Sequence, residues 1–172
     1  MDITLIGFIT VPILLLIEMR LSSKWSPLYF SKGIKLYSKE ARRHTTQIST
    51  DDIVTSLNNS FKGTGFSPSI YFKKINNETV GFREKLFEFT LFSYTPLMHG
   101  KIEIKNSNIN ISGFVNWYPI AFLCLWYAML LPTFRHDIDI MFLLAPIAIF
   151  GIIYLMQSKK YNKIFSQIAE IK

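Results

Sequence analysis

The chain has 172 residues and a mass of 20.0 kDa, and 49% of its residues are hydrophobic while 18% are charged. This composition excludes an intrinsically disordered chain, and the length suits about one compact domain. The only cysteine, Cys124, leaves no pair for an internal disulfide and excludes a cysteine-rich metal site. The apolar residues are concentrated in long uncharged blocks, which indicates a membrane protein.

The first uncharged block covers residues 3–17 and ends at Glu18. It predicts a first transmembrane helix within residues 1–19. A cleaved signal peptide is the alternative, but no basic segment precedes the block. Glu18, Met19 and Arg20 also stand where the small residues of a cleavage site would be expected. We therefore expect a retained membrane anchor.

Residues 20–116 are mixed in character and predict a small α+β domain. The segments 28–30 and 34–37 flank a short polar stretch, which favours a small hairpin or an interfacial loop. Residues 39–44 are polar and basic, and we expect them at the surface. A helix is predicted from Ser49, because Ser49 or Thr50 can cap it and Asp51 and Asp52 suit the positive end of its dipole.

The apolar stripe of this helix, Ile53, Val54, Leu57 and Phe61, ends before Gly63 and Gly65. The apolar period then changes from that of a helix to that of a strand. Strands are predicted over residues 69–75, 79–92, 101–105 and 109–115, with turns at 76–77 and 106–108. They form an antiparallel meander. We expect one face to be covered by the helix and the other to stay in water, carrying Lys73, Glu88, Lys101 and Glu103.

Two further uncharged blocks, residues 117–134 and 140–156, are separated by only five residues. They predict a transmembrane hairpin over residues 117–156, with Trp117, Tyr118 and Tyr154 near the headgroups. Residues 157–172 repeat apolar side chains at helical spacing, namely Tyr161, Ile164, Phe165, Ile168 and Ile171. This amphipathic helix could lie on lipid or pair with a second copy, but packing on the β domain is favoured.

The sequence thus predicts a membrane α-helical protein with three transmembrane helices and an inserted small α+β domain that contains an antiparallel β meander. Lysine and arginine flank the spans mainly on one side, and Arg135 is alone on the other. This bias predicts the N-terminus outside and both residues 20–116 and the tail 157–172 in the cytoplasm of a bacterial inner membrane. The lipid bilayer is therefore the first expected partner.

No motif for catalysis, phosphate binding or metal binding occurs, so no enzyme activity, cofactor or metal is expected. His136, Asp137 and Asp139 could together bind a cation or a proton, but a solvated loop explains them as well. His99 could titrate near neutrality, although an ordinary surface histidine is favoured. The basic group Arg42, Arg43 and His44 could attract lipid headgroups. Basic and aromatic residues are interleaved in residues 20–116, but without a binding motif a nucleic-acid partner is not expected.

Residues 92–127 read FSYTPLMHGKIEIKNSNINISGFVNWYPIAFLCLWY, a strand pair that leads directly into an apolar helix. This stretch resembles a loosely defined group of small uncharacterised bacterial membrane proteins, in which such a strand pair precedes a two-helix transmembrane hairpin. Leu97, Gly100, Ile102 and Gly113 carry the resemblance. It covers about a fifth of the chain and implies an architecture but no activity.

Two hypotheses for function follow. The first is a non-catalytic membrane-anchored binding or adaptor protein, in a sharper form an immunity protein against a membrane-directed toxin. The second is an accessory subunit of a membrane transport or envelope-enzyme complex. The uncharged blocks hold no Asp, Glu, Lys, Arg or His, which argues against a solitary transporter.

Overall fold

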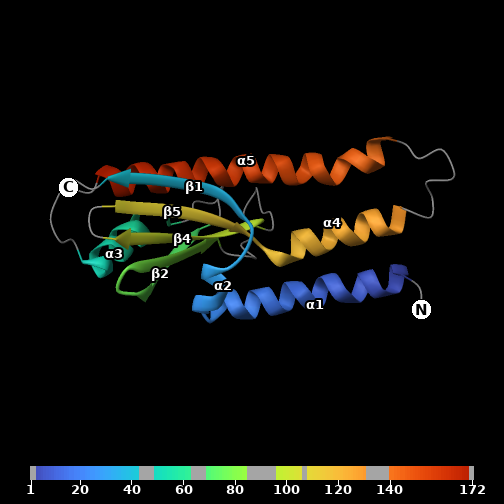
Figure 1. The fold of residues 1–172 in the computed structure, drawn as a ribbon, viewed down its shortest axis with the longest axis horizontal. Coiled ribbons are helices and arrows are strands. Elements are labelled where there is room, and N and C mark those ends of the chain that lie inside the picture. Colours follow the sequence, from blue (N-terminus) through green and yellow to red (C-terminus); the bar gives the residue numbers. More distant parts are fainter. Residues whose placement is uncertain are drawn as a thin grey trace.

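The structure is a computed structural model that describes residues 3–42, 49–62, 69–84, 96–105, 108–130 and 140–170. It is elongated, with a sheet at one end and helices at the other (Figure 1). The N-terminus lies at the helical end and the C-terminus at the sheet end. In chain order the elements are α1 Ile3–Ser23, α2 Pro27–Ser31, β1 Lys35–Arg42, α3 Thr50–Ser60, β2 Ile70–Asn76, β3 Thr79–Glu84, β4 Met98–Lys105, β5 Asn108–Val115, α4 Trp117–Leu130 and α5 Ile140–Glu170.

Within these described ranges the sheet has five strands in the order β1-β5-β4-β3-β2, and all neighbours are antiparallel. Strands β2 to β5 form the predicted meander. Strand β1 adds to its edge and pairs with β5, so that Lys39 lies opposite Ile111. The hairpin or loop predicted over residues 28–37 is therefore wrong. Pro27 begins a short helix instead, and the following polar segment is an edge strand because β5 offers it unpaired backbone groups.

The helix predicted from Ser49 is confirmed as α3. The Ser49 hydroxyl accepts a hydrogen bond from the Asp51 amide at 3.2 Å, and Asp51 and Asp52 occupy the first turn. The helix ends at Ser60, while the predicted stop signals Gly63 and Gly65 lie outside the described residues. The strand predicted over residues 79–92 is described as β3 only to Glu84, and residues 85–95 also lie outside the described ranges.

Helices α3 and α5 contribute to the core that covers one face of the sheet. Tyr161, Ile164 and Ile168 of α5 are almost fully buried with Ile53 and Leu57 of α3. The predicted packing of the tail on the sheet is confirmed by this burial. The tail continues the helix of the last apolar block, because α5 runs without a break from Ile140 to Glu170.

The prediction of three transmembrane helices is wrong. Among the described residues, α5 is the one helix long and apolar enough to cross a membrane, and α4 has only 14 residues, a length of about 21 Å. Helix α1 continues to Ser23 and buries Glu18 and Ser22 in its last turns. The helix ends thus take part in packing the domain, which a count of uncharged residues does not reveal. The fold is a small mixed α+β fold built on a five-stranded antiparallel sheet.

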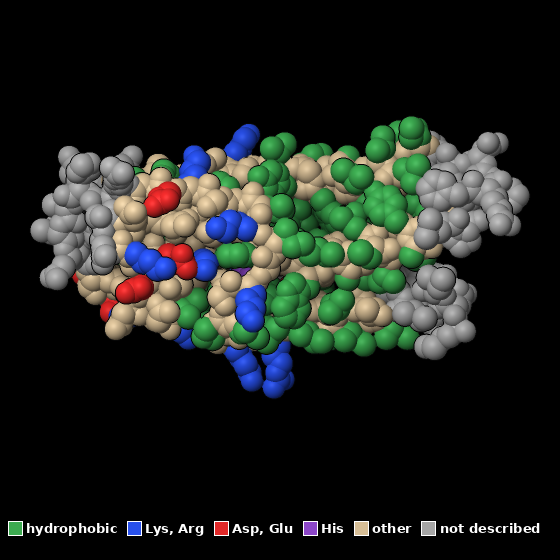
Figure 2. Space-filling view, viewed as in Figure 1, with side chains coloured by type: hydrophobic (Ala, Val, Ile, Leu, Met, Phe, Trp, Pro, Cys, Tyr) green, Lys and Arg blue, Asp and Glu red, His purple; other side chains and the backbone are tan. Residues whose placement is uncertain are grey.

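The surface divides into two chemically different halves. Figure 2 shows hydrophobic side chains over the helical half and mixed Lys, Arg, Asp and Glu side chains over the sheet half. In α5, only 11% of the most apolar 18-residue window is buried. The exposed large apolar residues of the helical half are Ile9, Ile13, Leu16, Ile17, Trp117, Met129, Ile140, Met141, Phe142, Leu144, Ile147, Ile149, Ile152 and Leu155.

Candidate functional site

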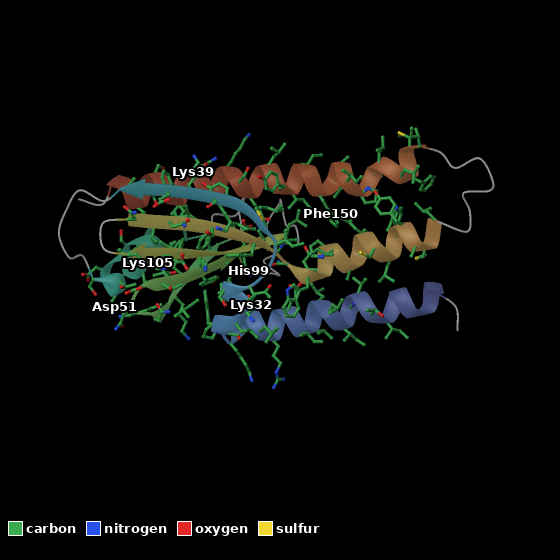
Figure 3. The ribbon with its side chains drawn as sticks, viewed as in Figure 1. Lys32, Lys39, Asp51, His99, Lys105 and Phe150 are labelled. Carbon is green, nitrogen blue, oxygen red and sulfur yellow. The ribbon has the colours of Figure 1, made fainter. Side chains whose placement is uncertain are left out.

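Polar side chains are buried where the helical half joins the sheet. The central one is His99 on β4, which lies at the junction of the two halves in Figure 3. Glu18 from α1, Tyr29 from α2, Arg83 from β3 and Asn116 surround a small cavity beside it, about 10 Å³ in volume. That volume holds about one water molecule, so the cavity is not an open substrate pocket. We call His99, Glu18, Tyr29, Arg83 and Asn116 the junction cluster.

His99 is 2% exposed and is held by both of its ring nitrogens. The Nδ1 atom lies 2.7 Å from Oδ1 of Asn116, and the Nε2 atom lies 2.9 Å from the backbone oxygen of Tyr29. The imidazole also stacks on the Tyr29 ring, with centroids 4.1 Å apart. Phe30 meets the imidazole edge-on and Phe114 stacks at 5.9 Å. The histidine is therefore fixed in both position and orientation.

Glu18 joins the end of α1 to the beginning of α4. Its carboxylate accepts hydrogen bonds from the backbone amides of Trp117 and Tyr118, the latter at 2.9 Å. These amides belong to the first turn of α4, where a helix has no partners of its own for its N–H groups and favours negative charge. Glu18 thus acts as an N-terminal cap supplied by another helix.

Asn116 is the residue that connects β5 to α4. Its side-chain amide donates to the backbone oxygen of Pro96 at 2.6 Å, and its backbone N–H donates to the oxygen of Leu97 at 2.7 Å. The Tyr29 hydroxyl lies 3.1 Å from Oδ1 of Asn116 and 3.2 Å from Oε1 of Glu18. The Tyr29 hydroxyl therefore links the carboxylate to the asparagine that contacts His99.

A second set of buried polar groups connects α5 to the sheet. Gln157 is fully buried, and its Oε1 accepts from the backbone amides of Leu97 and Met98 at 3.0 and 3.1 Å. The Glu84 carboxylate, which also lines the cavity, receives Lys160 Nζ at 3.0 Å. A paired and nearly buried carboxylate of this kind serves orientation more than net stability.

Burial dominates the electrostatics of the cluster. Desolvation lowers the pKa of the His99 imidazole, while its hydrogen bonds to Asn116 and Tyr29 act in the opposite direction. Burial and the nearby Glu18 carboxylate raise the pKa of the Tyr29 phenol, which keeps it a donor. Burial also lowers the pKa of the Arg83 guanidinium, which lies over the Trp25 ring at 5.2 Å.

The structure corrects the expectation for His99, which is not a surface histidine but one of the most deeply buried side chains. His44, His136, Asp137, Asp139 and Arg43 lie outside the described residues. Glu18 was recognised in the sequence only as the end of an apolar block. An acidic residue at the end of an otherwise apolar helix is the one signal that could have indicated its capping role.

Within the described ranges, no three His, Cys, Asp or Glu side chains form a group that could hold a metal ion. No known protein family, curated protein or solved structure matches the chain. The fold and the cluster define a class by themselves: a small α+β protein whose sheet is joined to an exposed apolar helical half by buried hydrogen bonds.

Proposed function

We propose that the protein is a non-catalytic membrane-anchored binding or adaptor protein. The apolar part of α5 enters the bilayer as the one spanning helix among the described residues, the shorter α4 packs against it, and the sheet half binds a protein partner at the membrane surface. The observation that carries this proposal is the division of the surface, because an exposed apolar area of this extent marks a lipid or protein contact.

The boundary between the two halves supports lipid as the contact. Arg20, Lys24, Lys32 and Lys159 are exposed there, and Trp117 is 38% exposed beside them. Basic side chains attract anionic headgroups by about 1 kcal/mol each, and tryptophan prefers the headgroup level. A basic and aromatic border around an apolar surface is typical of a segment that lies at the headgroup level of a bilayer.

The contact between helices also supports one apolar unit. The indole of Trp126 donates to the oxygen of Phe142 at 3.1 Å, and the Tyr127 hydroxyl donates to the oxygen of Leu143 at 2.8 Å. These bonds join α4 to α5 and leave the apolar side chains outward. In hydrocarbon such polar groups need internal partners, which these bonds supply.

Cys124 provides the test for membrane insertion, since it is exposed on α4 and is the only cysteine in the chain. We expect a spin label on Cys124 in anionic vesicles to be relaxed more by lipid-soluble oxygen than by a water-soluble nickel complex. A label at position 59 in an Asn59→Cys, Cys124→Ser variant is the matched control, because Asn59 is exposed on α3. A Cys124 label more accessible to the nickel complex would contradict insertion.

The side of the membrane is tested separately. Because basic side chains near a membrane favour the cytoplasmic side, we propose that the sheet half faces the cytoplasm of a bacterial inner membrane. We expect a cysteine introduced at Asn76, which is exposed at the end of β2, to resist an impermeant thiol reagent in intact cells. Rapid labelling in intact cells would overturn this orientation.

The partner is sought on the sheet half. Tyr71 on β2 is 41% exposed and its neighbour in the strand, Lys73, is exposed too. A photoreactive amino acid in place of Tyr71 should form a discrete protein adduct in cells, and its identity separates a toxin from a membrane complex. The same group in place of Met129, which is 39% exposed in the apolar half, should give lipid adducts instead. Absence of a protein adduct at Tyr71 and at Lys73 would count against an adaptor role for this face.

A further inference from the structure

The orientation of the Asn116 side chain is fixed by its own contacts. Its Nδ2 lies 2.6 Å from the backbone oxygen of Pro96, which can only accept a hydrogen bond. Exchanging the amide nitrogen and oxygen would place two acceptors face to face at that distance. The Tyr29 hydroxyl, which can donate, also lies 3.1 Å from Oδ1. The atom of Asn116 that faces His99 is therefore an oxygen.

Both ring nitrogens of His99 consequently face acceptors. Nδ1 meets the Asn116 carboxamide oxygen at 2.7 Å, and Nε2 meets the Tyr29 backbone oxygen at 2.9 Å. A neutral imidazole has a single N–H, so it can satisfy only one of these contacts. At the other contact the lone pair of the ring nitrogen then faces a lone pair of the oxygen. An imidazolium satisfies both.

We propose that the two hydrogen bonds of His99 depend on its protonation, and we call this pair of bonds the clasp. As an imidazolium, His99 donates to both Asn116 and Tyr29, and loss of one proton releases one of these two contacts. Asn116 precedes α4 and Tyr29 belongs to α2, so each contact ties one helical element to strand β4. Release at either place loosens the junction between the sheet and the helical half. The bonded arrangement described above is the protonated form.

The charges around His99 come from every element packed on the cluster. Glu18 of α1 supplies a carboxylate, which is linked to Asn116 through the Tyr29 hydroxyl. On β3, Arg83 lines the cavity with a positive charge, and the Glu84 carboxylate is already paired with Lys160 of α5. From α4, the Tyr118 hydroxyl donates to the oxygen of Pro96 at 3.1 Å. The Nζ atom of Lys101 on β4 lies 5.4 Å from the centroid of the Phe114 ring, on which the His99 ring stacks. Glu18 is therefore the carboxylate that lines the cavity beside His99 without an ion pair in the described part of the chain, and burial raises its pKa.

Burial opposes the charged form of His99 and lowers its pKa, so the clasp closes on the acidic side of neutrality. A histidine with one donor and one acceptor neighbour would not respond to pH in this way, because the neutral ring can donate with one nitrogen and accept with the other. The two acceptors fixed by backbone and asparagine geometry make the arrangement conditional on the proton.

The test is nitrogen NMR of the full chain in detergent micelles, with labelled histidine and with His44 and His136 replaced by glutamine. Between pH 8 and pH 4.5 (a range of about two units around the ordinary histidine pKa) we expect the His99 ring to pass from one N–H to two. The side-chain amide signal of Asn116 should change with the same midpoint. A ring that stays neutral over this range, or that titrates with no change at Asn116, would overturn the proposal.

Two carboxylate variants separate the clasp from a general effect of charge. Glu18→Gln removes the carboxylate that lines the cavity and should lower the His99 midpoint. Glu103→Gln is the matched control, because Glu103 lies on the same strand but pairs with Lys101 at 2.8 Å and does not line the cavity. Equal midpoints in the wild type and Glu18→Gln would contradict the role of Glu18. The titration of the wild-type ring decides the clasp itself, even where a variant fails to fold.

Discussion

The side chain of Asn58 on α3 bonds both backbone groups of Phe72 on β2. Its Nδ2 donates to the Phe72 oxygen and its Oδ1 accepts from the Phe72 N–H, each at 2.9 Å. Among the described residues, strand β2 is the last strand of the sheet at this side, and no described strand pairs with its outer backbone groups. The Asn58 carboxamide thus satisfies the outer backbone groups of Phe72 as a neighbouring strand would.

Asn58→Ala should lower the free energy of unfolding by about 1–2 kcal/mol, because two partly buried backbone groups lose their partners. Asn59→Ala is the matched control, since Asn59 is exposed on the same helix, and we expect its effect to stay within about 0.5 kcal/mol. Urea unfolding in mild detergent measures both. Equal losses in the two variants would mean that the contact to Phe72 contributes nothing specific.

Gly100 leaves the space that the Phe82 ring fills. A Cβ at Gly100 would lie 2.1 Å from Cζ of Phe82, and Phe82 is fully buried between Phe72 and Tyr161. Gly100→Ala should therefore displace the ring and cost about 1–3 kcal/mol of stability. The change should be visible as a loss of cooperativity in thermal unfolding followed by near-UV circular dichroism.

Gly151→Ala makes the contrasting substitution. A Cβ at Gly151 in α5 meets nothing within 4 Å, so alanine should be tolerated and should favour the helix by about 0.5–1 kcal/mol. If Gly100→Ala proves as harmless as Gly151→Ala, the close approach of Phe82 to β4 is not what the glycine provides.

Gln157 is expected to be essential for the attachment of α5 to β4. Gln157→Leu keeps the volume but leaves the buried amides of Leu97 and Met98 without their acceptor, and should cost about 2 kcal/mol or more. Gln167→Leu on the same helix is the control, because the Gln167 oxygen is buried with no hydrogen-bond partner in the described structure. That variant should be neutral or slightly stabilising. Unfolding free energies in which Gln167→Leu is the more harmful change would refute this role.

Tyr37 should make stability sensitive to alkaline pH. Burial, with a smaller effect of Tyr154, raises the pKa of Tyr37 to about 12, and its hydroxyl donates to Oδ1 of Asn162 at 2.9 Å. The unfolded phenol has a pKa of about 10, so the neutral form is favoured by folding. Its contribution is complete below about pH 10 and is lost as pH rises through the folded-state value.

Tyr37→Phe removes this alkaline sensitivity. The variant should be less stable than the wild type at pH 8, and the difference should shrink at about pH 11, where the wild-type phenol begins to favour the unfolded chain. Unfolding free energies of both proteins at the two pH values measure the change, since lysine titration is common to both. A difference that grows with pH would show that the sign is wrong.

Local features were readable from the sequence where neighbouring residues decide them. The cap at Ser49, the stripe of α3 and the turn after β2 depend on residues within a few positions of each other, and the structure has them where expected. The burial of Tyr161 also followed from helical spacing. By contrast, strand β1 has the composition of a surface loop, and only its pairing with β5 makes it a strand.

The sequence by itself determined that a mixed α and β region would be joined to strongly apolar segments, because periodicity and charge are properties of the chain alone. Tertiary structure decided the rest. Glu18, Tyr29, His99 and Asn116 come from four separate parts of the chain, and a single histidine within a strand pattern does not show by itself whether its ring is buried. Hydrogen bonds between distant residues depend on how elements pack, and no local pattern encodes that packing.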